Sequence, residues 1–472
     1  MDNIPSNPPL HLIHRSAAEF LACAFLDLFP GAYLIDGDTT EFGFYYDFIA
    51  QQPIDPQALP MLEEKMRGLA KQDIEIRILD MMRENAAKLF EHKEQLFKAD
   101  QIRGARENIV QVLQIGDFYD YSRSLSSLEI KPVLDSKLLE VERTTRYFPE
   151  EEEIEVVRIY GVASHDKAAL KKAVKIYTAG KKRNHQVLGE KLKLFTFNNI
   201  STKQTPTWLP KGVLLRDRLI NWCKREYEEQ NFQLVSSPLL IKKELTKKIY
   251  LESGIEEESI SSLIEDVEYV IPMTFIPSHI QLFKAESHSC NDQPIRYAEC
   301  GQLAQKSRNH SLWGLLNIPL AHVEEVSIFC NSKDLEKELI SFLQFIDKTA
   351  KMFNLGCHWI LYPRGKPLTS PPAGWNDGLN SFSKAFEACS IEWKAELGNT
   401  RSTYLTAEAH LIDGIGREWK GPRIGIAFTL PEKLGLRFQE GNVPAMLTGS
   451  LFGSFERFIA ILIENDAGKL PL

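Results

Sequence analysis

The 472-residue sequence lacks several patterns that would assign it quickly to a class of protein. Its 7 cysteines form no Cys-x-x-Cys pair, so neither a zinc ribbon nor a disulfide-stapled secreted fold is indicated. No Gly-x-Gly-x-x-Gly run follows a predicted strand, which argues against a dinucleotide-binding Rossmann domain. No apolar stretch reaches signal-peptide or membrane-spanning length, so we predict a cytoplasmic protein without a membrane partner.

The sequence also lacks an excess of positive charge. Its formal net charge is −8, so no general field attracts nucleic acid, and any such binding must depend on local basic patches. One such patch is a predicted helix at 171–193, which carries eight Lys or Arg residues. A solvated helix face is the simplest interpretation of this run, and contact with an RNA backbone is the alternative.

What the sequence does contain is a mixture of helical and strand-like patterns. The elements predicted in the first part are a helix over 16–29, two strands around an Asp-Gly turn in 33–48, helices over 57–104 and a strand over 156–163. The elements predicted after a polar boundary near 197–206 are an amphipathic helix, strands at 233–240, 295–304 and 323–330, a helix over 333–353 and a closing helix. Long helices interleaved with antiparallel-looking strands predict an α+β fold.

The predicted closing helix, LFGSFERFIAILIE at 451–464, is apolar apart from two adjacent charges, Glu456 and Arg457. A buried charge is costly unless it is paired or meets a ligand. The simplest interpretation is therefore a structural ion pair. The alternative is that Arg457 holds a phosphate, because a planar guanidinium fits phosphate oxygens well.

Several stretches, taken in order, resemble the threonyl-tRNA synthetases, a family of class II aminoacyl-tRNA synthetases. The family's editing domain opens on a stretch similar to FLDLFPGAYLIDGDTTEFGFYYDF, and its linking segment is similar to GKKRNHQVLGEKLKLF. The three motifs of its catalytic core resemble WLPKGVLLRDRLINWCKREYEEQNFQLVSSPLL, RYAECGQL and VPAMLTGSLFGSFERFIAILIENDAG. The resemblance runs from about residue 11 to about residue 468.

This resemblance implies an α+β fold in two domains. An editing-like domain with a linker helix is expected over 1–200, and an antiparallel class II sheet with flanking helices over 205–472. The resemblance also implies a homodimer, with Pro238 at the dimer-interface proline of motif 1. We expect neither the family's small N-terminal domain nor its C-terminal anticodon-binding domain in this chain.

The resemblance places a site for ATP, with magnesium, on the core domain. Arg457 matches the motif 3 arginine that binds the γ-phosphate, and Glu299 is a supporting candidate. An ungapped alignment puts Gln305 at the motif 2 arginine, which stabilises charge on the α-phosphate, and Ser307 at the following glutamate. A local shift would bring Arg308 to the arginine position, so Arg308 stays a candidate.

The family's zinc site is not expected in this chain. That site uses one Cys and two His, and their positions carry Phe275, Ser327 and Thr448. A phenylalanine cannot bind zinc, and neutral hydroxyls are poor zinc ligands. Three other side chains of ligand type lie nearby with no recognisable spacing: His279, His288 and Cys290.

Further functional positions of the family are replaced as well. They are Thr403 and Thr406 in the substrate loop, Gly425 on a later strand, and Arg15, Glu19, Ser122 and Ser126 in the editing-like domain, where His14 lies one place from an editing histidine. The replacements affect zinc recognition, phosphate activation and editing, which are chemically independent.

These losses predict a truncated and degenerate relative of the family with lost or impaired threonine–tRNA ligase activity. Such a protein would act by binding tRNA or a full-length synthetase. The alternative is an ATP-dependent enzyme that adenylates a different amino acid or small substrate, with ATP held by Arg457 and Arg308. A threonine ligase with relocated ligands would need more compensating changes than either.

Overall fold

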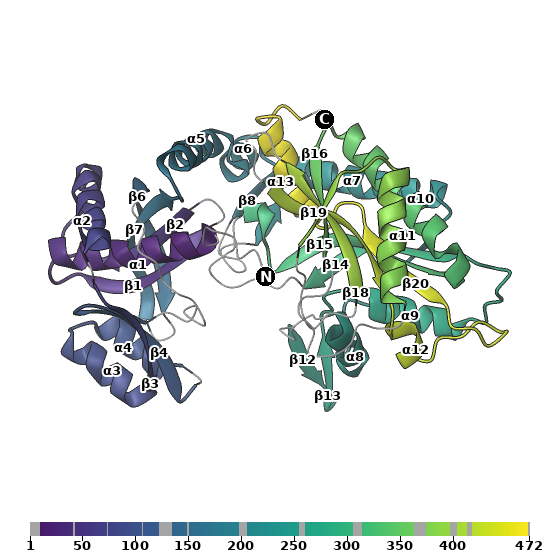
Figure 1. Cartoon of the computed structure of the whole chain (residues 1–472), viewed down its shortest axis with the longest axis horizontal. Helices are drawn as coiled ribbons and strands as arrows, with labels where there is room; N and C mark the ends of the chain where they lie inside the picture. The colour runs from purple at the N-terminus through teal and green to yellow at the C-terminus, as the bar shows by residue number, and fades with distance from the viewer. Residues whose placement is uncertain are drawn as a thin grey trace. The chain divides into compact units, whose positions relative to one another are not determined.

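The computed structural model describes residues 10–40, 43–72, 74–105, 107–121, 135–148, 151–197, 205–253, 260–304, 314–362, 374–396, 404–412 and 418–470. The chain divides into two compact units, Met1–Lys181 and Lys182–Leu472, which are described separately (Figure 1). Among the helices within those ranges, none combines the length and apolar character that crossing a bilayer requires.

The first unit contains two β-sheets, each with helices packed against it. Its elements are α1 (Leu10–Leu28), β1 (Tyr33–Thr40), β2 (Gly43–Ile49), η1 (Pro56–Ala58), α2 (Leu59–Lys71), β3 (Ile76–Met82), α3 (Arg83–His92), α4 (Leu96–Arg103), β4 (Ile109–Ile115), β5 (Phe118–Tyr121), β6 (Ser136–Phe148), β7 (Glu151–Ala163) and the start of α5 (Lys167–Arg183). One sheet has the strand order β1-β2-β7-β6, and the other has the order β3-β4-β5.

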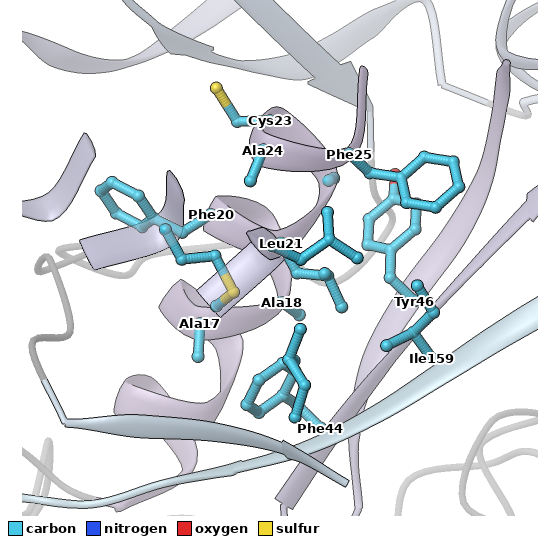
Figure 2. Close-up of a cluster of buried hydrophobic side chains, with 14 of the residues drawn as sticks. Ala17, Ala18, Phe20, Leu21, Cys23, Ala24, Phe25, Phe44, Tyr46 and Ile159 are labelled. Carbon is cyan, nitrogen blue, oxygen red and sulfur yellow. The ribbon is translucent and has the colours of Figure 1, made fainter. Parts of the chain in front are cut away.

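Helix α1 packs on the four-stranded sheet through a continuous apolar face. Leu21 and Phe25, four residues apart and so on one side of the helix, are both fully buried. Phe25 stacks on Phe48 of β2, with ring centroids 3.8 Å apart. Figure 2 shows this core, with α1 beside the strands that carry Phe44 and Ile159. The packing fixes the position of the polar residues near the start of the same helix.

The predicted Asp-Gly turn at Asp36-Gly37 is wrong. Strand β1 continues through these residues, Gly37 pairs with Tyr46 of β2, and the chain reverses between Thr40 and Gly43. A Cβ atom on Gly37 would lie 2.2 Å from a ring carbon of Tyr46. The glycine is therefore needed because an aromatic ring lies against the strand, not because the backbone turns. The helical interpretation of 57–104 likewise missed β3, which pairs with β4.

The second unit is built on one large sheet. Its elements are α6 (His185–Lys191), β8 (Phe195–Phe197), β9 (Pro206–Trp208), α7 (Pro210–Glu229), β10 (Gln233–Val235), β11 (Ile241–Lys242), α8 (Glu244–Ser253), β12 (Ser261–Ile264), β13 (Val267–Val270), α9 (Ile276–Ala285), β14 (Ile295–Ala304), η2 (Gly314–Leu316), β15 (Leu320–Cys330), η3 (Ser332–Asp334), α10 (Leu335–Met352), β16 (Gly356–Tyr362), α11 (Trp375–Ala388), β17 (Trp393–Ala395), β18 (Tyr404–Ile412), β19 (Glu418–Ala427), α12 (Leu430–Lys433), β20 (Ala445–Ser450) and α13 (Phe455–Asn465).

The eight strands of the large sheet follow the order β10-β14-β15-β20-β19-β18-β16-β17. All neighbours are antiparallel except β10 with β14 and β16 with β17, which are parallel. Helix α7 lies on one face, where Tyr227 meets Glu324 of β15. Helix α9 lies on the opposite face, where Ile280 and Phe283 pack with Phe329. The α+β fold with an antiparallel sheet and flanking helices is confirmed, and β14 begins and ends where the sequence predicts.

Candidate functional site

The face of the large sheet beneath α9 carries a row of polar positions. The strand register aligns, across six strands, Tyr297, Ser327, Thr448, Gly425, Thr406 and Tyr362. Residues directly opposite one another in a sheet share a face. The four central members are positions at which the resemblance expects zinc ligands or substrate contacts. The fold therefore places Ser327 directly opposite Thr448, although they are 121 positions apart in the sequence.

The next row on this face is charged. Glu299 lies opposite Glu325, and Arg423 lies between Ser450 on β20 and Glu408 on β18. An ion pair joins Nη2 of Arg423 to Oε1 of Glu325 at 2.6 Å. Only Glu299 of this row was predicted from the sequence. The signal that could have revealed Arg423 is a single charge within the apolar strand RIGIAF.

The three positions of the family's zinc ligands lie near one another. Ser327 and Thr448 are directly opposite on β15 and β20, and Phe275 immediately precedes α9. Ser327 Oγ lies 2.9 Å from Nδ1 of His279, whose Nε2 is 3.4 Å from a carboxylate oxygen of Glu299. All of these side chains are buried. Polar groups at this place are thus engaged with one another.

No metal-binding group is evident in the described parts of the chain, where no three His, Cys, Asp or Glu side chains gather in a suitable arrangement. His279 comes close to Ser327 and Glu299, but a hydroxyl contributes weakly to zinc binding. His288 lies against the ring of Phe283, and Cys290 donates its backbone N–H to Glu440. The expectation that zinc is not bound stays a prediction.

Glu299 binds the end of the motif 1 strand. Its Oε1 accepts hydrogen bonds from the Ser237 amide at 2.6 Å and from the Ser237 hydroxyl at 2.8 Å. Pro238 follows directly and is exposed. Glu299 therefore fixes the segment on which the resemblance places the dimer interface, and its carboxylate is held by main-chain and side-chain donors.

Arg457 lies in the first turn of α13 and binds two main-chain carbonyls. Its Nε donates to the oxygen of Leu316 at 2.8 Å, and Nη1 donates to the oxygen of Lys420 at 3.1 Å. Glu456 accepts a hydrogen bond from the amide of His322 at 2.9 Å and lies 2.7 Å from its Nδ1. An ion pair between Glu456 and Arg457 is therefore not formed. The two adjacent charges instead hold different segments of the unit.

A second interaction holds the turn η2 that Arg457 contacts. The amide of Leu315 donates to Nε2 of His185 at 3.0 Å, and Nδ1 of His185 lies 2.7 Å from Oε1 of Glu464. The segment after η2 leads into β15 and the polar row. Gln305, Ser307 and Arg308, which precede η2, lie outside the described residues, as does Thr403 of the substrate loop.

Glu324 supports the start of α13 from the opposite face of the sheet. It accepts hydrogen bonds from the Tyr227 hydroxyl at 2.5 Å and from the amides of Leu451 and Phe452 at 2.7 and 2.6 Å. Burial raises the pKa of Glu324 to about 8, although these hydrogen bonds favour its carboxylate. This residue therefore carries a proton-dependent contribution to stability.

In the first unit, Arg15 and Glu19, at the positions where the resemblance expects two editing histidines, form a buried hydrogen-bonded pair. Arg15 Nη2 lies 2.8 Å from Oε1 of Glu19, one helical turn along α1, and Nη1 donates to the carbonyl of Gly37 at 2.8 Å. His14 Nε2 lies 3.1 Å from the carbonyl oxygen of Ala163. An arginine paired in this way is a poor acid–base group, because its guanidinium stays protonated.

The same interior also holds a buried ion pair. Lys98 Nζ lies 2.7 Å from Oδ1 of Asp120, and the hydroxyl of Tyr46 donates to Oδ2 at 2.5 Å. Burial, together with the nearby Asp120, raises the pKa of Glu19 to about 8. The Tyr46–Asp120 contact joins the two sheets of the first unit. Ser122 and Ser126, expected at the other editing positions, lie outside the described residues.

Comparisons with known proteins agree with this architecture. No family model matches the chain. It is 29% identical to the threonine–tRNA ligase of Lawsonia intracellularis over 99% of its own length and 73% of the relative's, and 28% identical to that of Desulforamulus reducens over 97% and 73%. A solved structure described as the RNA binding domain of threonyl-tRNA synthetase from Cryptosporidium parvum Iowa II shares the fold.

That structure has a TM-score of 0.57 and 24% identity, with 61% of this chain and 74% of that chain covered. The sequence similarity extends along nearly the whole chain and passes through both units. The sheet also carries the expected motif segments in the expected order. Over nearly its whole length the chain is therefore similar to threonine–tRNA ligases, and it shares the fold of a threonyl-tRNA synthetase domain.

Proposed function

We propose that this chain is a cytoplasmic synthetase-like protein with lost or impaired threonine–tRNA ligase activity that works by binding RNA. The observation that carries the proposal is the polar row, in which the expected ligand and substrate positions hold Ser327, Thr448, Thr406 and Gly425. Hydroxyls are poor replacements for two zinc-binding histidines, and Gly425 has no side chain with which to contact a substrate.

The other two chemistries support the same proposal. Arg457, the candidate for the γ-phosphate, donates to the carbonyls of Leu316 and Lys420. Gln305 cannot supply the positive charge of a motif 2 arginine. In the editing-like unit, the Arg15–Glu19 pair stands where two histidines would act on an ester. Each change alone would reduce catalysis, and they occur at separate places.

The surface that would bind RNA is the basic helix α5. Its sequence, KAALKKAVKIYTAGKKR, contains seven cationic residues and no acidic one. Lys167, Lys171, Lys175 and Lys182 recur on one side of the helix, and all four are exposed. At 1.5 Å per residue this stripe spans about 22 Å, a length that can contact several phosphates of an RNA backbone.

Two assays test this function. ATP–pyrophosphate exchange with threonine should not exceed the protein-free background, and robust exchange would contradict the loss of ligase activity. Extending the exchange assay to the other amino acids tests the alternative of a different adenylating enzyme, which would use ATP with magnesium. A positive result with one of them would replace the proposed function.

RNA binding is tested by filter binding of tRNA to the wild type and to a K171E/K175E variant. We expect at least a tenfold loss of affinity and a shallower dependence on salt, because fewer counterions are released. The matched control is K247E/K248E, which makes the same charge change at exposed positions of α8. Equal losses in the two variants would point to general electrostatics and contradict a role of α5.

We also propose a homodimer through the motif 1 region. Apolar side chains are exposed beside Pro238, with Leu239 45% and Leu240 39% accessible, and Leu263 on β12 is 69% accessible. A second copy of the chain would cover exposed apolar side chains of this kind. Sedimentation of the wild type and of a Leu239→Glu/Leu263→Glu variant tests this, and a monomeric wild type would favour a different partner, such as a full-length synthetase.

A further inference from the structure

We propose that Arg423 is an internal ligand of the sheet face: its guanidinium occupies a subsite, formed by Glu325 and Ser450, that is suited to a small organic cation. The ligands that fit are a guanidinium or a primary ammonium group. This inference concerns the remodelled site itself and does not depend on RNA binding by α5.

Hydrogen bonds from groups other than Arg423 fix the position of the Glu325 carboxylate. Its Oε2 accepts hydrogen bonds from the Thr274 hydroxyl at 2.5 Å and from the Phe275 amide at 2.6 Å. Both donors lie at the start of α9, and the Glu325 side chain is only 2% exposed. The carboxylate is therefore fixed in place with Oε1 directed at its partner. A buried carboxylate of this kind requires a positive partner.

Arg423 supplies that charge from two strands away. Strand β20 lies between β15 and β19, so the 2.6 Å contact between Arg423 and Glu325 passes over Ser450, which is the register partner of Arg423. The Ser450 hydroxyl is buried, and within the described ranges it has no hydrogen-bond partner. An unsatisfied buried hydroxyl costs stability. Its position beside the guanidinium leaves one polar group available to a bound molecule.

The contact is built differently from a structural ion pair on the other face of the sheet. Arg296 donates to both oxygens of Glu338 at 2.9 Å, and its side chain is 17% exposed. Arg423 donates to Glu325 from Nη2 alone, and its side chain is 48% exposed. A monodentate, solvent-accessible guanidinium loses less when displaced than a bidentate buried one. Arg423 can therefore leave while Glu325 stays in place.

The neighbour of Arg423 on this face belongs to the polar row. Gly425 is the next residue of β19 on this face and carries no side chain. A Cβ atom there would lie 3.0 Å from the hydroxyl oxygen of Thr406. The Thr406 hydroxyl therefore lies close to Gly425, beside the subsite. A ligand that binds Glu325 through its cation would extend over Gly425 toward Thr406.

Chemical complementation tests the proposal, with ethylguanidinium chloride as the probe. Arg423→Ala should bind the probe at least ten times more tightly than the wild type, in calorimetry at constant ionic strength. Arg423→Ala/Glu325→Gln should lose this binding. Arg437→Ala removes an exposed arginine that donates to the carbonyl of Leu436, and it should bind no better than the wild type.

Two results would overturn the proposal. One is a folded Arg423→Ala protein, judged by circular dichroism, that binds the probe no better than the wild type. The other is probe binding that persists when Glu325 is also replaced. If Arg423→Ala does not fold, Arg423→Gln replaces it with the same expectations, because glutamine keeps most of the length of the side chain without its charge.

Discussion

His279 on α9 and Ser327 on β15 are joined by a hydrogen bond of 2.9 Å between Nδ1 and Oγ. Ser327 stands at a position where the resemblance expects a zinc-binding residue, and the bond ties α9 to the centre of the sheet. It also gives the buried imidazole a partner that no metal has to provide.

Replacing Ser327 by alanine should lower the free energy of unfolding by about 1–3 kcal/mol, because the buried His279 nitrogen loses its partner. Urea denaturation of the variant measures this change. Ser450→Ala is the matched control, since Ser450 is a buried serine on the adjacent strand whose hydroxyl has no hydrogen-bond partner within the described ranges. Equal destabilisation by the two substitutions would show that the His279 contact contributes nothing.

Replacing Arg457 by alanine should destabilise the second unit by about 2 kcal/mol, because two carbonyls lose a charged donor. Arg457→Lys keeps the charge but cannot reach both the Leu316 and Lys420 oxygens as a fork does. Unfolding curves and calorimetry with magnesium ATP should be recorded for both variants. Unchanged stability together with loss of ATP binding would contradict the anchoring role and indicate a surviving phosphate site.

Stability should fall as the pH rises from about 5 to about 8. The folded-state pKa of Glu19 is raised to about 8, whereas the unfolded value is about 4.3. Between these values the folded chain holds a proton that the unfolded chain has released, so raising the pH favours unfolding. Glu324 acts in the same direction. Each group contributes a slope of up to about 1.4 kcal/mol per pH unit.

Glu19→Gln isolates the contribution of the first unit. The amide cannot ionise, so the pH dependence of the urea midpoint should become shallower, with the largest gain in stability at pH 8. Glu64→Gln changes an exposed carboxyl on α2 and should leave the slope as it is. A Glu19→Gln profile that runs parallel to the wild type would contradict the raised pKa.

Lys98→Met should destabilise the first unit by about 3–5 kcal/mol, because Asp120 would be left as an uncompensated buried charge. Adding Asp120→Asn should recover a large part of that loss, since the unpaired charge is then removed. Thermal unfolding of the single and double variants measures the coupling. Strictly additive effects would mean that the two side chains do not interact.

The sequence predicts long elements well and special backbone positions poorly. Helix α10 and strand β14 have clear apolar periodicity and were placed within about two residues of their observed bounds. Gly37 was assigned to a turn because glycine after aspartate usually indicates one, whereas its role depends on the Tyr46 ring of a neighbouring strand. That contact has no local signature.

In the candidate site, too, the sequence predicts some residues and misses others. Motif spacing selected Ser327, Thr448 and Gly425, and strand register shows that they form one row. The partnership of Arg423 with Glu325 could not be predicted, because it joins strands separated by β20. Long-range pairs of this kind follow from sheet order, which a periodic pattern does not encode.

The hydrogen bonds of Glu456 and Arg457 can be kept while neighbouring residues are substituted during evolution. Three of their contacts use main-chain atoms, namely the amide of His322 and the carbonyls of Leu316 and Lys420. Main-chain atoms remain when side chains are substituted. The Glu456-Arg457 pair can therefore keep its structural role when the catalytic residues around it are replaced. Its presence in a sequence does not show that the protein reacts with a nucleotide.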